Sequence, residues 1–411
     1  MPAAAQSWRG PFLRYLAGRG LSLAGSTLAT IVLAFAVLDA GGDAFAVGLV
    51  LTTSVLTQAL GLPVAGVLAD RAPRRRVVVA ANVALAVAQT TMGLLLVIAP
   101  DRVPMVAFVA AAAVSGAAAA ATKPALQGIV VELVPPESRQ SANAWHRLVV
   151  NVARVGVPGL GGVLAAAVGF GPVLIGAGAA FVASAVVLAT LPLGVVRAAP
   201  ATWWADAREG GAAVAGRTWM WTYLLSGAVG VPLWLAGYQL LGPVIAAQRP
   251  AGLQFWGWAV SAFVVGMLAG SLVALRWRPR RPMLATVAVL LAWPLPLAVL
   301  ALDVHLAWVL VPMAISGLAL DLSIVFFETA RQQHVPERLI GRVTSIGQLS
   351  ELALVPVGYL LGGSVADRIG PAPVLWGCVA GLVGCTAALF AVRDIRTLTW
   401  RLEPEGHKVG R

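Results

Sequence analysis

The sequence predicts an all-α integral membrane protein whose twelve transmembrane helices form two pseudo-symmetric bundles of six. Three observations predict this fold class. Of the 411 residues, 59% are hydrophobic and only 11% are charged, whereas a soluble domain carries about a quarter charged residues. Apolar segments of about 20 residues, the length that spans a bilayer, recur along the chain. The second half of the chain also repeats features of the first half.

Each apolar segment is predicted to be a helix, because backbone polar groups in lipid must be hydrogen-bonded within their own segment. The segments do not alternate polar and apolar residues as the strands of a membrane barrel do. The predicted spans are 15–38, 45–69, 77–99, 103–133, 141–168, 170–193, 218–246, 253–275, 283–302, 304–334, 339–365 and 371–392.

The internal repeat has an offset of 201 residues. Gly161-Gly162 matches Gly362-Gly363, and Gly169 matches Gly370, at the junctions that follow spans 5 and 11. Parallel repeats of six spans are typical of transporters that bind a substrate between their halves. The predicted domains are an N-terminal bundle (1–193), a cytoplasmic linker (194–217), a C-terminal bundle (218–392) and a cytoplasmic tail (393–411).

Basic residues lie mainly on one side of the predicted membrane. Most of the 29 Lys and Arg fall in the termini and in the loops that share their side, whereas the opposite loops hold Arg102, Arg249 and Arg368. By the positive-inside rule, both termini are cytoplasmic in the cell (inner or plasma) membrane. The net charge of +12 therefore faces anionic lipid headgroups rather than a nucleic acid.

The stretch GVLADRAPRRRV, residues 66–77, resembles the signature loop between spans 2 and 3 of the major facilitator superfamily. The matching residues are Gly66, Asp70, Arg71, Arg74 and Arg75, and Pro73 stands where the family usually has Gly. In span 5, ARVGVPGLGG resembles the family's antiporter stretch through Pro158, Gly161 and Gly162, with Val157 in place of Gly. Residues 326–345 resemble the macrolide-efflux-like drug:proton antiporters.

The resemblance implies a conformational latch at this loop. Asp70 would approach the start of span 11 near Gly341 in the outward-facing state, where a carboxylate is stabilised by a helix N-terminus. Arg74 or Arg75 could pair with Glu132 at the foot of span 4. The alternative is that the arginines only set topology, and for Arg76 we favour that interpretation.

Ionisable groups inside the spans are expected to be functional, because burying them in lipid is costly. Glu328 of span 10 is the predicted carrier of the coupling proton, with Asp321 in reserve and Lys123 as a cationic competitor. Gln127 is the repeat-mate of Glu328. Arg331 could instead neutralise Glu328, since the two are three residues apart on a helix.

A second polar group is predicted to form a gate between the bundles. Four residues of span 5 share one helical face at spacings of 4, 4 and 3, and Glu351 of span 11 is expected to pair with a span 5 arginine. The four are Asn143, Arg147, Asn151 and Arg154. Phe35, Tyr223, Trp234 and Phe327 are expected to line the cavity.

The sequence therefore favours proton-coupled efflux of an amphiphilic small molecule, a drug or metabolite, by alternating access. The alternatives are an uptake symporter of the same fold and a non-transporting membrane sensor or partner subunit. An intramembrane enzyme is disfavoured, because neither a paired-carboxylate metal motif nor a His–carboxylate pair is found. Cys378 and Cys385 are about 10 Å apart on one helix, too far for a disulfide. We expect a monomer without metal or cofactor, in contact with protons, lipid and substrate.

Overall fold

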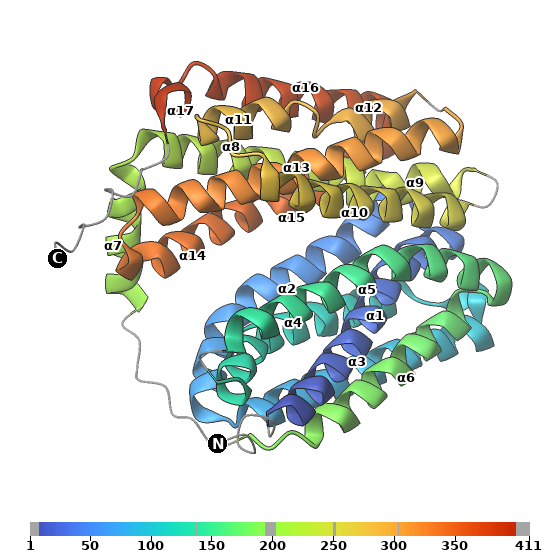
Figure 1. Cartoon of the computed structure of the whole chain (residues 1–411). Helices are drawn as coiled ribbons and strands as arrows, with labels where there is room; N and C mark the ends of the chain where they lie inside the picture. The colour runs from blue at the N-terminus through green and yellow to red at the C-terminus, as the bar shows by residue number, and fades with distance from the viewer. Residues whose placement is uncertain (1–7, 136–137, 194–202, 250–251, 303, 400–411) are drawn as a thin grey trace.

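The computed structural model describes residues 8–135, 138–193, 203–249, 252–302 and 304–399, and every regular element in these ranges is helical. The first half forms a bundle of six long helices (Figure 1). They are α1 (Arg9–Asp39), α2 (Ala44–Arg71), α3 (Arg74–Ile98), α4 (Met105–Leu133), α5 (Arg139–Val168) and α6 (Phe170–Ala189), with the short η1 (Pro100–Arg102) before α4.

In the second half, α7 (Trp203–Ala215) leads into six further spans, three of which are interrupted. Span 7 combines α8 (Thr218–Leu235), the π-helical η3 (Ala236–Leu241) and α9 (Gly242–Ala247). Span 9 combines α11 (Pro282–Leu290) and α12 (Leu295–Ala301). Span 11 combines α14 (Glu337–Ala353) and α15 (Val355–Ile369). The continuous spans are α10 (Gly252–Arg276), α13 (Leu306–His334) and α16 (Pro371–Leu389), and α17 (Arg393–Thr397) follows. Prolines explain two of the interruptions, because Pro294 in span 9 and Pro356 in span 11 lack a backbone N–H at or beside the break.

The predicted fold class is confirmed. Among the described residues, eleven helical spans are long and apolar enough to cross a membrane. The α5 helix contributes a shorter apolar segment, Gly156–Val168, because many side chains of its first part lie outside the described residues. At 30 residues, α5 is about 45 Å long, enough to cross the bilayer.

The sequence repeat has a counterpart in the backbone. Gly169 separates α5 from α6 with φ +85°, and Gly370 separates α15 from α16 with φ +86°. Glycine adopts this region of backbone conformation without the steric cost that a Cβ brings. The two junctions therefore turn the chain in the same way in both halves.

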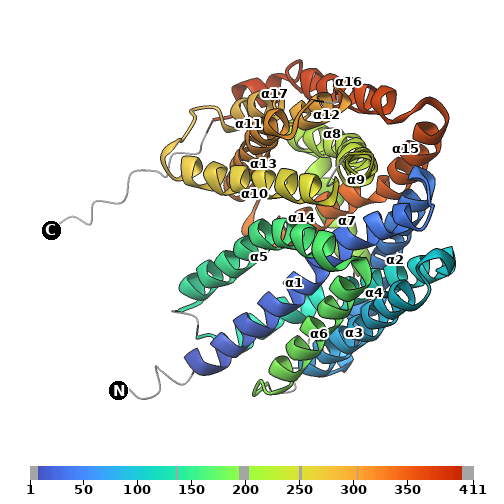
Figure 2. The same cartoon turned by 90° about the vertical axis from the view of Figure 1, so that its right-hand side faces the viewer.

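The two bundles pack against each other through α2 with α15 and through α5 with α10, and α1 also contacts α9 (Figures 1 and 2). The two main seams are pseudo-equivalent. A Cβ on Gly162 of α5 would lie 2.8 Å from the carbonyl oxygen of Leu253, and a Cβ on Gly363 of α15 would lie 2.7 Å from that of Ala44. The repeated glycines thus allow each helix to reach the start of a helix in the other bundle.

We call the end of the molecule where α1 begins and α2 finishes the terminal end, and the end that holds the α1–α2 loop the far end. At the far end, one hydrophobic cluster joins both bundles, with Phe35 and Val47 from one and Trp256 and Tyr359 from the other. At the terminal end, the buried clusters are separate. One is built around Tyr15, Ile129 and Leu188 and the other around Met220, Phe327 and Val343. Among the described residues, a shared buried core therefore joins the bundles at the far end.

Candidate functional site

A large cavity lies inside the N-terminal bundle, with a volume of about 770 Å³. Its lining residues come from all six helices of that bundle, α1 to α6. The cavity extends from Tyr15 and Val130, near the terminal end, to Val47, next to the core that closes the far end. This size suits a drug-sized molecule.

One wall of the cavity is a polar stripe on α1. Arg19, Ser22, Ser26 and Thr30 follow one another at spacings of three and four residues, which places them on one helical face. The Ser26 hydroxyl donates to the Ser22 carbonyl at 2.8 Å, and the Thr30 hydroxyl donates to the Ser26 carbonyl at 2.9 Å. Because each proton is used within the helix, the lone pairs of each hydroxyl remain available to accept from a ligand.

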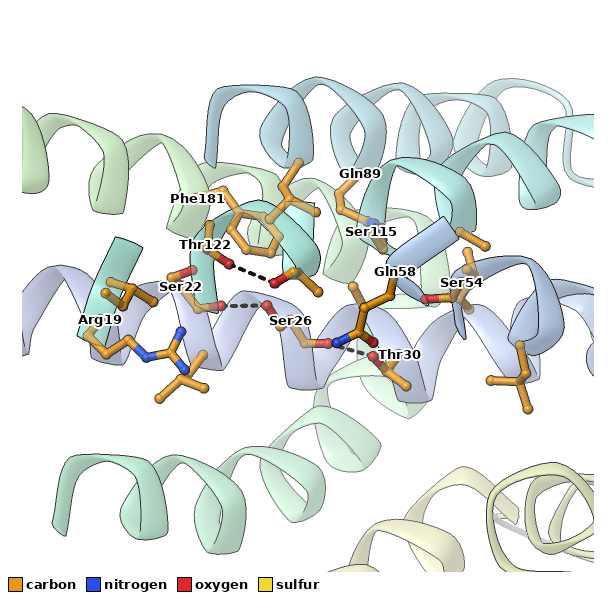
Figure 3. Close-up of a pocket in the computed structure, with 18 of the residues that line it drawn as sticks. Arg19, Ser22, Ser26, Thr30, Ser54, Gln58, Gln89, Ser115, Thr122 and Phe181 are labelled. Carbon is orange, nitrogen blue, oxygen red and sulfur yellow. Dashed lines mark hydrogen bonds between the residues drawn. The ribbon is translucent and has the colours of Figure 1, made fainter. Parts of the chain in front are cut away.

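The opposite side of the cavity carries amides and hydroxyls from α2, α3 and α4 (Figure 3). Gln58 projects from α2, Gln89 from α3, and Ser115 and Thr122 from α4. Gln89 is 1% exposed, and its amide nitrogen lies 3.4 Å from the Ser115 hydroxyl. The Gln89 carbonyl oxygen is buried without a hydrogen-bond partner, which is costly unless a ligand supplies a donor.

Near the terminal end, the cavity contains an aromatic pair. The Tyr15 hydroxyl lies 3.3 Å from Nδ1 of His146, and the two rings stack with centroids 5.9 Å apart. Arg19 lies one turn further along α1 than Tyr15. A donor-rich group is therefore placed toward the terminal end of the cavity.

The helices that form the cavity have an unusual distribution of charge. The sequences of α1 to α6 contain three carboxylates, Asp39, Asp70 and Glu132, and each lies within the last two residues of its helix. The middle of the bundle thus receives basic residues, Arg19 among them, and no acidic ones from these helices. Its interior is electropositive.

The predicted latch region is partly described. The turn between α2 and α3 is only Ala72 and Pro73. Nη1 of Arg74 lies 3.7 Å from Oε2 of Glu132, and Arg75 donates to the carbonyl of Leu191 at 3.2 Å. The structure therefore brings Arg74 and Glu132 together. The side chains of Gly66, Asp70 and Arg71 lie outside the described residues.

The predicted coupling residues of α13 do not line the cavity. Glu328 forms an ion pair with Arg331, whose side chain is 8% exposed and whose guanidinium carbon lies 5.8 Å from the centre of the Phe327 ring. Asp321 accepts a hydrogen bond from the Ser271 hydroxyl of α10 at 2.6 Å. Both carboxylates thus contact a partner inside their own bundle, and the coupling role of Glu328, Asp321 and Arg331 stays a prediction. The side chains of Lys123 and Gln127 lie outside the described residues.

The pairing of Glu351 with a span 5 arginine stays a prediction. Glu351 lies on α14, where its Cγ would be 3.8 Å from a Cβ on Gly227 of α8, in the same bundle. The side chains of Asn143, Arg147, Asn151 and Arg154 lie outside the described residues. Of the antiporter-like stretch, Pro158 and Gly162 lie at the seam with α10, and a Cβ on Gly161 would contact Leu28 of α1.

The expected cavity aromatics lie elsewhere. Phe35 and Trp234 are buried in the far-end core, where Trp234 stacks with Trp293. Tyr223 stacks on Phe327 with centroids 4.3 Å apart. None of the four lines the 770 Å³ cavity. The sequence prediction of the cavity relied on aromatic residues. The pattern that indicates the cavity wall is the helical spacing of four polar residues within an apolar span, namely Arg19, Ser22, Ser26 and Thr30.

A two-bundle helical membrane protein with a polar cavity inside one bundle and a single closed end has the architecture of a membrane transporter. The sequence profile of the Major Facilitator Superfamily matches residues 15–355, and the chain belongs to this family. It is a transporter rather than an enzyme.

Similar proteins agree with this assignment. The multidrug efflux pump Tap of Mycolicibacterium fortuitum is 26% identical over 379 residues, covering 88% of this chain and 90% of the pump. Among solved structures, the nucleoside transporter NupG superposes with a TM-score of 0.70 at 13% identity, covering 96% of this chain and 100% of that one. A bacterial ferroportin homologue in an inward-facing state has a TM-score of 0.69 at 19% identity, covering 94% and 99%. These structural likenesses establish the fold.

Proposed function

We propose that the protein is a proton-coupled exporter that moves an amphiphilic small molecule out of the cell by alternating access. The observation that carries this proposal is the asymmetry of the two ends. The cavity reaches toward the terminal end, where the buried clusters of the bundles are separate, while a shared core closes the far end. Similarity to the efflux pump Tap supports the outward direction.

The charge distribution gives this asymmetry a direction in the membrane. Basic residues gather at the terminal end, in the α2–α3 turn and around the loop after α10. The positive-inside rule assigns that end to the cytoplasm of a cell membrane. The conformation is then inward-facing, and the substrate enters from the cytoplasm or the inner leaflet.

Proton coupling is assigned to Glu328 as an exchange of partners. In this conformation, Glu328 forms an ion pair with Arg331. Opening toward the acidic outside separates the pair and lets Glu328 take a proton. Return to the inward-facing state restores the ion pair and releases the proton to the cytoplasm. Asp321, held by Ser271, is the second candidate.

The outward-facing state needs contacts that close the terminal end. We assign this role to Asp70 at the start of α14 near Gly341, with Arg74 and Glu132 holding the α2–α3 turn in place. Glu351 and the polar face of α5 would meet when the terminal ends approach. Lys123 and Gln127 would then lie on the wall opposite α13.

The proposal is tested with purified protein in liposomes and three dansyl probes that share one hexyl chain. The probes end in a carboxylate, a neutral carboxamide or a trimethylammonium group. With an acidic lumen, an antiporter accumulates a probe in the lumen as protons leave. Protein-dependent accumulation in an acidic lumen supports proton-coupled antiport. Accumulation only in an alkaline lumen indicates symport, and no protein-dependent accumulation of any probe contradicts a transport function.

A further inference from the structure

We propose that the cavity of the N-terminal bundle selects anionic, hydrogen-bond-donating amphiphiles, with Arg19 binding the acidic group and Gln89 accepting from a hydroxyl or amide. This inference rests on the proposed function, because it takes the cavity as the site of the transported molecule. It adds the substrate's charge and polarity.

The charges of the residues around the cavity favour an anionic molecule. The described lining residues include Arg19 and His146 and no carboxylate. The remaining residues of α1 to α6 supply none either, apart from Asp39, Asp70 and Glu132 at the helix ends. A cation in the cavity would meet like charge in a low-dielectric space, where that repulsion is strong. An anion would be attracted.

Arg19 has the geometry of an anion-binding residue. It lies on the cavity face of α1, in line with the hydroxyls of Ser22 and Ser26 (Figure 3). It lies toward the terminal end of the cavity, one turn beyond Tyr15. A guanidinium group binds a carboxylate or phosphate through two parallel hydrogen bonds. The acidic group of the substrate would therefore remain toward the terminal end.

Gln89 defines the second polar contact. Its carbonyl oxygen is buried and has no partner, while its amide nitrogen is directed to Ser115. The free oxygen accepts only from a donor, such as a hydroxyl or an amide N–H. A site that buries an unpaired acceptor discriminates strongly against analogues that lack the donor.

The apolar part of the cavity explains why the substrate is an amphiphile. Leu33, Leu85 and Phe181 line the same space as the polar groups, and Phe181 is fully buried. They supply apolar surface for the body of the molecule beside the two polar contacts.

Two carboxylates of the C-terminal bundle lie away from the cavity. Glu328 is paired with Arg331, and Asp321 accepts a hydrogen bond from Ser271. Neither lines the cavity. The described lining residues therefore offer a cationic molecule no acidic group in this conformation.

Equilibrium binding of the three dansyl probes to purified protein, measured by fluorescence anisotropy, tests the charge preference. We expect the carboxylate to bind at least about tenfold more tightly than the trimethylammonium probe, as hydrogen bonds to a charged group imply. In Arg19→Gln, the carboxylate and trimethylammonium probes should bind within about twofold of each other, while carboxamide binding stays unchanged. Arg19→Lys should keep part of the preference for the carboxylate probe. The matched control is Arg14→Gln, because the exposed Arg14 donates to Thr190 outside the cavity.

A second comparison tests Gln89. A carboxylate probe with one added hydroxyl on its chain should bind several-fold more tightly than the plain probe, and Gln89→Leu should remove this advantage. Equal or tighter binding of the trimethylammonium probe by the native protein contradicts the proposal. So does a preference that survives in Arg19→Gln, or no binding of the carboxylate at millimolar concentration. Transport without charge preference would overturn only this inference, whereas selective binding without transport would overturn the proposed function.

Discussion

The carboxylate of Asp367, at the end of α15, accepts hydrogen bonds from the backbone N–H groups of Ala44 and Phe45 at 3.1 and 2.9 Å. These N–H groups belong to the first turn of α2, where a helix has no internal acceptors for them and carries a partial positive charge. The contact joins the two bundles at the far end. At the pseudo-equivalent position in α5, 201 residues earlier, the chain has Ala166. The α2–α15 seam therefore has a charged cap that the matching position of α5 does not repeat.

Replacing this cap should loosen the far end. Asp367→Asn removes the charge and one acceptor, and we expect a loss of about 1 kcal/mol from far-end closure, or about a fivefold shift toward the outward-facing state. Amide hydrogen exchange at Ala44 and Phe45 should accelerate. The control is Asp43→Asn, since Asp43 caps Ala46 within its own bundle. Equal acceleration in both variants would show that the inter-bundle contact has no separate role.

Close backbone packing at the same seam gives a second prediction. In Gly363→Ala, the new Cβ would lie 2.7 Å from the Ala44 carbonyl oxygen, and relieving the overlap should cost about 1–3 kcal/mol of far-end closure. Gly377→Ala is the matched control, because nothing lies within 4 Å of its Cβ position. Disulfide trapping of cysteines introduced across the α2–α15 seam should slow in the first variant only. Unchanged trapping would mean that the seam tolerates the methyl group.

The ion pair of α13 leads to a prediction about coupling. Glu328→Gln mimics the protonated carboxyl and leaves the buried Arg331 without its ion-pair partner, which should destabilise this conformation. Uphill transport in proteoliposomes should vanish while probe binding persists, and Glu328→Asp should retain part of the activity. If Glu328→Gln still accumulates a probe against its gradient, Glu328 is a structural partner of Arg331 and another group carries the proton.

The α2–α3 turn gives a prediction for the opposite conformation. Asp70→Asn keeps the size of the side chain but loses the charge that a helix N-terminus favours, so closure of the terminal end should weaken by about 0.3–2 kcal/mol. Transport should fall while the amount of folded protein stays unchanged. Arg76→Gln, in the same turn region, should have little effect on transport. Wild-type flux in Asp70→Asn would show that the turn only sets the topology of the chain in the membrane.

The sequence predicted the fold well because the bilayer imposes simple rules. Span length and the positions of Gly169 and Gly370 follow from local chemistry, whereas the interruption of span 11 beside Pro356 was not predicted. The cavity was harder to predict, because Glu328 and Asp321 could face either the cavity or a neighbouring side chain. Their partners, Arg331 and Ser271, decide this, and the Ser271 contact depends on packing between helices distant in sequence.

Side-specific labelling of Ser26→Cys tests the central claim most directly, because Ser26 is an exposed hydroxyl on the cavity wall. The background carries Cys378→Ser and Cys385→Ser, which removes both native thiols. A membrane-impermeant maleimide should label this cysteine rapidly from the cytoplasmic face in inside-out vesicles, and a bound probe should slow labelling at least about threefold. Labelling only from the outer face, or a rate that no probe changes, would contradict an inward-facing substrate cavity in the N-terminal bundle.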